Sequence, residues 1–170
     1  VEAGDTTERM FGLAVDLGTT TVVATLLDLT TGTPVSVHSM LNKQQPFGAD
    51  VITRISATMM DPTALDRLRQ AATDTLTELV ADVCRDGSVA PEEVYEVAIA
   101  RNATMVALLL GVDPEPIGVA PFIQASATWP TVRATEIGLS LHPGARVVLI
   151  PALGAYVGGD IVAGMLAAGM

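Results

Sequence analysis

The stretch Phe11–Thr21, FGLAVDLGTTT, constrains the fold more than any other part of this chain. Its apolar start leads to a single carboxylate at Asp16, and after Gly18 come three consecutive threonine hydroxyls. A second apolar and β-branched run, Val22–Leu27, follows at once. An apolar strand that turns through Asp-x-Gly-Thr-Thr straight into another strand predicts a β-hairpin with a polar tip.

The tip of this hairpin has the chemistry of a phosphate site. Gly18 lets the backbone approach a ligand closely, and successive N–H groups in such a turn form a concavity suited to phosphate. Asp16, at the end of a buried strand, is placed to hold a hydrated divalent cation. The stretch is not a Walker loop, because it lacks GxxxxGK[ST] and a strand follows the glycine. The alternative is an ordinary hairpin whose aspartate caps its own turn.

The composition excludes several classes of protein. A chain of 170 residues with 49% hydrophobic residues and a mean hydropathy of +0.46 can bury a sizeable core and is not disordered. A formal net charge of −10 argues against binding to nucleic acids or anionic membranes. No apolar run is long enough to predict a membrane span. The single cysteine, Cys84, is predicted to be a core residue. Because one cysteine cannot form an internal disulfide, a reducing, cytoplasmic compartment is favoured.

Hydrophobic periodicity predicts the elements of the first half. Three strands are expected, at residues 11–17, 21–28 and 35–40. A polar loop then leads to a short helix with Asp50 in its first turn. A long helix follows, for which Asp61 is the expected N-cap, Pro62 the first residue and Gly87 the end.

The second half alternates strands and helices around an irregular segment. The expected elements are a strand at 94–100, a helix capped by Asn102 and ending at Leu110, a strand at 146–150 and a helix at 158–170. Residues 117–143 are interpreted as an insertion folded over one edge, and residues 1–10 as the tail of a linker. This order predicts an α/β fold with a mixed five-stranded sheet. An antiparallel meander is followed by helix-linked parallel strands, with helices on both faces, as in a ribonuclease H-like subdomain.

The hairpin and this topology together resemble one half of an actin-like ATPase, the superfamily of actin, sugar kinases and heat-shock chaperone ATPases. In that superfamily the first hairpin wraps the β- and γ-phosphates of ATP, and its aspartate orients magnesium and its waters. The segment 147–169 matches the strand and helix that form part of the hinge between the two halves. The residues that match the phosphate hairpin are Asp16, Gly18, Thr19, Thr20 and Thr21.

A closer similarity is to the reductive activators of corrinoid proteins. Four blocks carry it: FGLAVDLGTTTVVATLLDLTTG, NKQQPFGADVITRI, RNATMVALLLGVDPEPIGVAPF and PALGAYVGGDIVAG. They stand in the family's order and cover nearly all of residues 11–170. The chain departs from the family at Arg101, where the family usually has glycine, so a role that needs close approach to this backbone is not carried over.

The resemblance implies that residues 11–170 are the first half of an ATPase domain that binds ATP and Mg²⁺ between two halves. ATP hydrolysis would drive electron transfer from a two-iron two-sulfur domain to the cobalt(II) of a corrinoid protein or corrinoid-dependent methyltransferase. The second half of the ATPase and the ferredoxin-like domain would lie outside this sequence, which holds one cysteine. The fragment by itself is expected to be inactive.

Other polar residues allow two interpretations each. Asp160 is either an acid favoured by the dipole in the first turn of a helix or a second carboxylate that positions magnesium or the attacking water. Gly154, Gly158 and Gly159 allow either close helix packing or close approach of a ligand; we count Gly158 and Gly159 with the nucleotide-binding residues.

The block from Asn42 to Arg54 contains Asn42, Gln44, Asp50 and Arg54, for which solvated loop polarity is the default expectation. A place in the cleft or on a partner surface is the alternative. His38 and His142 have no companions at ligand spacing, so no metal site built by the protein alone is predicted. Trp129 is expected to fill a local gap in the core.

Two other functions keep the same fold. A kinase for a small hydroxylated metabolite needs a base and a specificity pocket, for which the 117–143 insertion is the candidate. A non-catalytic interaction module would use the acidic surface and the insertion to dock a partner.

Overall fold

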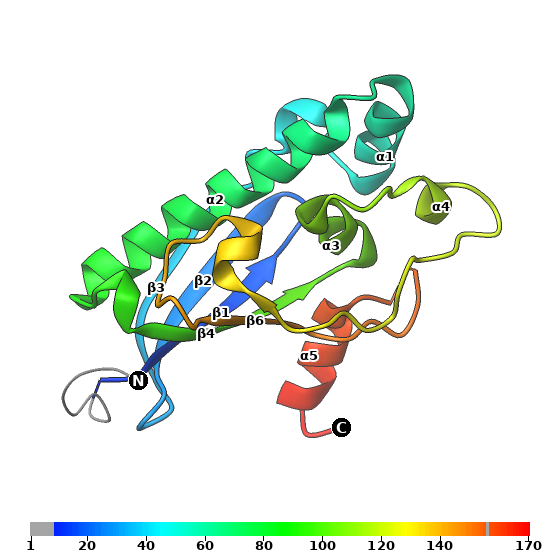
Figure 1. The fold of residues 1–170 in the computed structure, drawn as a ribbon. Helices are drawn as coiled ribbons and strands as arrows, with labels where there is room; N and C mark the ends of the chain where they lie inside the picture. The colour runs from blue at the N-terminus through cyan, green and yellow to red at the C-terminus, as the bar shows by residue number, and fades with distance from the viewer. Residues whose placement is uncertain (1–8, 156) are drawn as a thin grey trace.

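The computed structural model describes residues 9–155 and 157–170 as a mixed sheet with helices on its two faces (Figure 1). Of the expected linker tail, residues 1–10, only residues 9 and 10 are among the described residues. The elements are β1 (Phe11–Leu17), β2 (Thr21–Asp28), β3 (Thr33–Leu41), η1 (Gln45–Phe47), α1 (Val51–Met60), α2 (Ala64–Gly87), η2 (Pro91–Glu93), β4 (Val94–Arg101), α3 (Ala103–Leu110), α4 (Glu115–Gly118), β5 (Val132–Arg133), η3 (Ala134–Ile137), β6 (Arg146–Leu149) and α5 (Gly159–Ala167).

The sheet has six strands in the order β3-β2-β1-β4-β6-β5. β1, β2 and β3 form the predicted antiparallel meander, and β4 and β6 follow as parallel strands. The expected number of five strands is wrong, because the insertion supplies a short sixth strand. That strand, β5, pairs antiparallel with the outer side of β6, where Val132 lies opposite Val147.

The central strands present two different faces. Along β1, Leu13, Val15 and Leu17 are buried, whereas Ala14 and Asp16 are exposed. α2 covers the buried face, as its period of three to four apolar residues predicts; its contacting side chains are Leu68, Ala72, Leu76, Leu79 and Val83. α5 lies on the other side of the sheet, beside β4 (Figure 1). Asp16 therefore stands on the sparsely covered face.

Core burial agrees with the prediction for the single cysteine and for the tryptophan. Cys84 is buried on α2, and this burial raises the pKa of its thiol to about 11. Trp129 is partly buried and packs against the main core. Within the described chain, no helix combines the length and apolar character needed to cross a bilayer.

Two helix boundaries differ from the prediction. α2 begins at Ala64 rather than Pro62, and its N-cap position is Thr63. Asp61 instead closes the turn between the helices, because its carboxylate accepts hydrogen bonds from the N–H and hydroxyl of Thr63. α5 ends at Ala167 rather than residue 170, and the side chains of Ile161 and Leu166 are exposed.

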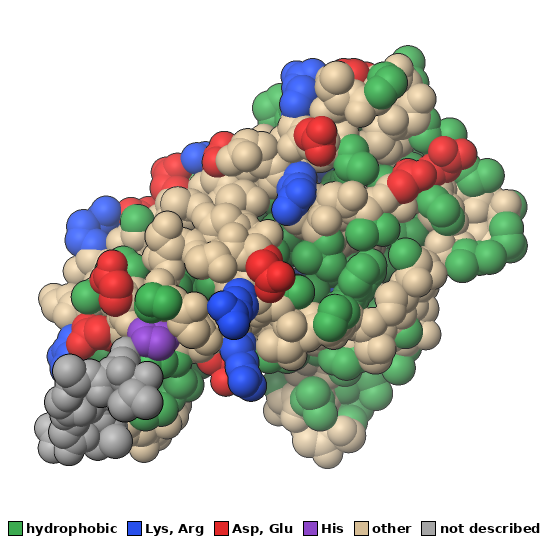
Figure 2. Space-filling view, in the orientation of Figure 1, with side chains coloured by type: hydrophobic (Ala, Val, Ile, Leu, Met, Phe, Trp, Pro, Cys, Tyr) green, Lys and Arg blue, Asp and Glu red, His purple; other side chains and the backbone are tan. Residues whose placement is uncertain are grey.

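The segment between α3 and β6 is largely irregular, as expected, and it leaves apolar side chains on the surface. Val119, Phe122 and Ile123 are exposed after α4. Figure 2 shows apolar side chains gathered on the side of the molecule where α4 and its loop lie in Figure 1, and charged side chains of both signs along α2.

Candidate functional site

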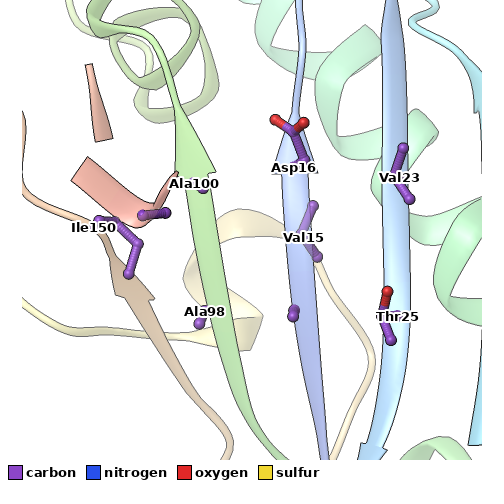
Figure 3. Close-up of a pocket in the computed structure, with 9 residues that line it drawn as sticks. Val15, Asp16, Val23, Thr25, Ala98, Ala100 and Ile150 are labelled. Carbon is purple, nitrogen blue, oxygen red and sulfur yellow. The ribbon is translucent and has the colours of Figure 1, made fainter. Parts of the chain in front are cut away.

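The candidate site lies where β1 and β4 end side by side. Asp16 is paired with Val23 of β2 and with Ala100 of β4. In Figure 3 its carboxylate extends beyond the small and apolar side chains of the pocket toward the end of the strand. The pocket has a volume of about 300 Å³, and its lining includes Ala98 and Ala100 of β4 and Ile150, which follows β6. The small side chains therefore leave open space beside Asp16, which is the one carboxylate among the described lining residues.

The hairpin between β1 and β2 is held from behind by three side-chain and backbone donors. Asn42 Nδ2 donates to the carbonyl of Gly18 at 2.9 Å, and Arg54 Nη2 donates to the carbonyl of Thr19 at 2.6 Å. The backbone N–H of Asn42 donates to the carbonyl of Thr20 at 2.8 Å. The carbonyl groups of Gly18 and Thr19 therefore face the buried side chains of Asn42 and Arg54, whereas that of Thr20 continues the ladder between β2 and β3.

This anchoring decides where the N–H groups of the tip point. In a trans peptide the carbonyl and the N–H lie on opposite sides, so an inward carbonyl at Gly18 turns the N–H of Thr19 outward. The carbonyl of Thr19 does the same for the N–H of Thr20. Within the described chain neither N–H donates to another protein group. Two adjacent N–H groups with this orientation have the arrangement that, in turns of this kind, is suited to an anion.

Gly18 is required by the geometry of the tip. A Cβ atom at this position would lie 2.3 Å from the carbonyl oxygen of Thr21, which is backbone and cannot move aside. The neighbouring Thr19 hydroxyl accepts a hydrogen bond from Asn102 Nδ2 at 3.2 Å. Asn102 also caps α3 through Met105 N, as the sequence predicts. The hairpin tip and the start of α3 are thus joined directly.

The negative charge of Asp160 acts on the predicted metal ligand Asp16. The pKa of Asp16 is raised, first by partial burial and then by the negative charge of Asp160. Asp160 lies in the first turn of α5, where its carboxylate accepts the N–H of Ile161 at 2.9 Å. Asp16 makes no hydrogen bond through its carboxylate within the described chain. Mg²⁺ is bound by one or two carboxylates and several waters, so this pair fits a hydrated magnesium ion.

Gly158 and Gly159 are buried where α5 begins. A Cβ atom on Gly158 would lie 2.6 Å from the carbonyl oxygen of Arg101, and one on Gly159 would lie 2.4 Å from the carbonyl oxygen of Ile150. Of the two predicted uses of these glycines, close packing is therefore the one that the described chain displays. Gly154, in contrast, has open space around it.

The default expectation for the polar block after β3 is wrong. Asn42, Gln44 and Arg54 are at most 1% exposed and lie behind the hairpin instead of in solvent. Gln44 bridges this group, because its side chain donates to the carbonyl of Leu68 and accepts from Arg54 Nη1. Asp50 remains exposed and caps α1 through a capping box with Thr53.

The sequence marks this block as polar, but its composition does not indicate that it is buried. A loop that contains proline, glycine and several polar residues has the composition of a solvated loop. The available signal was the alternation of Asn42 and Gln44 with the charged Lys43, whose ammonium group reaches outward to Glu78. That period of two continues the pattern of β3.

Arg101 is the second buried cation at this end of the sheet. Its Nη1 donates to the carbonyl of Ile150, whereas its Nε and Nη2 have no acceptor within the part of the chain that the structure describes. Burial lowers the pKa of its guanidinium to about 10, against the opposing influence of Asp160. The described residues contain no group of three or more His, Cys, Asp and Glu arranged to hold a metal.

The chain is similar to proteins that act on corrinoid proteins. The family model described as "RACo middle region" matches residues 11–170. The corrinoid activation enzyme RamQ of Eubacterium limosum is 34% identical over 166 residues, which are 98% of this chain and 28% of RamQ. A solved reductive activator for a corrinoid, iron–sulfur protein is 39% identical, with a TM-score of 0.95 over 99% of this chain and 27% of that one. The chain thus spans less than a third of the length of either relative.

Proposed function

Because the chain belongs to the RACo middle region family, we propose that it is the first half of an actin-like ATP-binding domain in a cytoplasmic activator of a corrinoid protein. The outward N–H groups of Thr19 and Thr20 are the observation that carries this proposal. They would bind the terminal phosphates of ATP, with help from the hydroxyls of Thr19, Thr20 and Thr21. The second half of the domain would close over the nucleotide from the opposite side.

The carboxylates have a separate task in this proposal. Asp16, helped by Asp160, would hold Mg²⁺ through its water shell next to the phosphates. The bound metal would neutralise the charge that develops on the phosphate oxygens during hydrolysis. Asp16 is suited to this because its carboxylate accepts no hydrogen bond from the described residues and because a bound cation would relieve its repulsion with Asp160.

The purpose of the ATPase in the whole protein follows from the relatives. RamQ and the solved reductive activator are named for activation of corrinoid proteins. We propose that opening and closing of the nucleotide cleft drives an electron from a two-iron two-sulfur domain to a cobalt(II) corrinoid on a partner protein. Nucleic acids and membranes have no part in this proposal, in keeping with the acidic composition.

The small-metabolite kinase is less well supported. A second pocket, of about 270 Å³, lies beside the hairpin and is lined by Thr19, Ile55, Asn102, Ile117 and other residues. The described residues that line it include no aspartate, glutamate or histidine, so they offer no general base for a substrate hydroxyl. The 117–143 insertion contributes only Ile117.

Asp16→Asn in the full-length protein tests the proposal. We expect hydrolysis of Mg-ATP to fall by about 100-fold or more, because a charge-stabilising group of the transition state is lost. Asp28→Asn is the matched control, since Asp28 lies at the opposite end of the same hairpin and its carboxylate accepts hydrogen bonds from Thr30 and Thr31 of the adjoining turn. Steady-state hydrolysis and calorimetric titration with Mg-ATP measure both effects. Undiminished binding and hydrolysis in Asp16→Asn would show that Asp16 does not hold the metal of the bound nucleotide and would overturn its part in the proposal.

A further inference from the structure

Arg54 lies behind the hairpin in a position that the proposed function does not explain. It comes from α1, and its guanidinium is 0% exposed. It donates to the carbonyl of Thr19 at 2.6 Å, to Gln44 Oε1 at 2.9 Å and to the carbonyl of Gly48 at 3.0 Å. A weaker contact to the sulfur of Met105 measures 3.4 Å. Each of the three guanidinium nitrogen atoms thus has at least one acceptor.

The charge of Arg54 is not balanced by an acid in contact with it. All its partners are neutral, and none of the salt bridges within the described chain includes Arg54. Asp50 favours its charged form only from a distance, against the burial that lowers the pKa of the guanidinium. An arginine stays protonated even so. A buried charge without a counter-ion carries a desolvation cost, which the hydrogen bonds of Arg54 offset but which a nearby anion would reduce further.

An anion bound at the hairpin tip would supply the negative charge that Arg54 lacks. Arg54 is separated from the outward N–H of Thr20 by a single peptide, the one whose carbonyl it binds. In surroundings of low polarity its field reaches through that peptide with little screening. The same hydrogen bond polarises the peptide and makes its N–H a better donor. An anion at the tip would therefore gain from both the orientation and the charge.

We propose that Arg54 is a positioning residue for the terminal phosphates of a bound polyphosphate. It turns the Thr19–Thr20 peptide so that its N–H faces the ligand, and it supplies the interior positive charge that the ligand balances. Asn42 performs the orienting part of this task for the preceding peptide, without charge. The inference rests on the proposed function, because it takes the hairpin as the phosphate site.

The test compares three variants of the full-length protein. Arg54→Met removes the charge and the hydrogen bonds, and Arg54→Lys keeps the charge but loses the fork. Lys43→Met is the matched control, because it removes one positive charge from the same block at an exposed side chain paired with Glu78. The dissociation constants for Mg-ATP, Mg-tripolyphosphate and adenosine are measured for each by calorimetry. Adenosine reports on the integrity of the domain without using the phosphate site.

In Arg54→Met we expect both polyphosphates to bind about 10- to 100-fold more weakly, as for loss of a hydrogen bond to a charged group. Adenosine binding should stay within about twofold, and Lys43→Met should bind all three ligands normally. Arg54→Lys should lie between wild type and Arg54→Met, and it carries the test alone if Arg54→Met fails to fold. Equal losses for adenosine and tripolyphosphate would mean that Arg54 only supports the fold.

The two proposals fail in different ways. Polyphosphate binding that is weakened by Asp16→Asn but unchanged in both Arg54 variants overturns the role of Arg54 and leaves the phosphate site in place. Failure of the unmodified protein to bind either polyphosphate overturns the phosphate site and the role of Arg54 with it.

Discussion

Arg54 and Arg101 are both fully buried near the same hairpin, yet their surroundings differ. Each guanidinium nitrogen of Arg54 donates to at least one acceptor. Arg101 binds one carbonyl and leaves two nitrogen atoms without acceptors among the described residues. Buried N–H groups without acceptors cost free energy, and a buried charge adds to that cost. We therefore expect the charge of Arg101 to be a net burden on the stability of the fold.

Arg101→Met tests this difference because methionine fills much of the same space without charge. We expect the free energy of unfolding to rise by about 1 kcal/mol, as when buried charges are replaced by apolar groups of similar volume. Arg54→Met should lower it by about 3 kcal/mol, because Gln44 and the carbonyl of Thr19 lose their donor while buried. Urea unfolding of this chain, followed by circular dichroism, measures both changes. A destabilised Arg101→Met would mean that its single hydrogen bond and the attraction of Asp160 outweigh the burial of charge.

Among the elements, α5 depends on glycine for its position. Gly158 and Gly159 bring the start of the helix against the backbone at the ends of β4 and β6. Asp160 follows immediately, so the same contact sets the distance between this carboxylate and Asp16. Farther along α5, Gly164 has no heavy atom within 4 Å of the place where a Cβ would stand. One helix thus contains a crowded glycine and an unconstrained one.

Gly158→Ala and Gly164→Ala form a matched pair of predictions. Gly158→Ala should lower the free energy of unfolding by about 1 to 3 kcal/mol, because the new methyl group meets backbone atoms of Arg101 and Asn102 at 2.6 Å. Gly164→Ala should raise it by about 0.5 to 1 kcal/mol through helix propensity alone. Urea denaturation of the two variants compares them directly. If both variants were stabilised, α5 would not be packed against β4 as described.

A feature of the fold can be predicted from the sequence when the residues that determine it lie close together along the chain. The hairpin, α1, α3 and the meander were predictable because their periodicity and caps lie within a few residues, as with Asn102 and α3. The start of α2 was not, because Asp61 can cap either a helix or the turn that it closes here. The burial of Gln44 depends on the carbonyl of Leu68 in a different element, and no local pattern reports such a contact.

At the scale of the whole molecule, the charge distribution opposes the proposed ligand. The chain has 19 acidic against 9 basic residues and a net charge of −10. Two of the basic side chains, Arg54 and Arg101, are buried at the hairpin end of the sheet. The surface therefore repels a polyphosphate, while the interior behind the hairpin attracts it. Salt screens charges in water strongly and buried charges weakly. It should therefore weaken the repulsion between the acidic surface and a polyphosphate more than the attraction of the polyphosphate to the buried arginines.

Screening of the net negative charge should also make the folded chain more stable as ionic strength rises. We expect the free energy of unfolding to rise by about 0.5 to 1 kcal/mol between about 20 and about 200 mM NaCl, because surface self-repulsion is screened. Urea unfolding at several salt concentrations measures the slope. The double variant Glu92→Gln/Glu96→Gln removes two exposed negative charges and should flatten that slope. Stability that falls with salt would instead indicate that attractive surface pairs, such as Lys43 with Glu78, dominate.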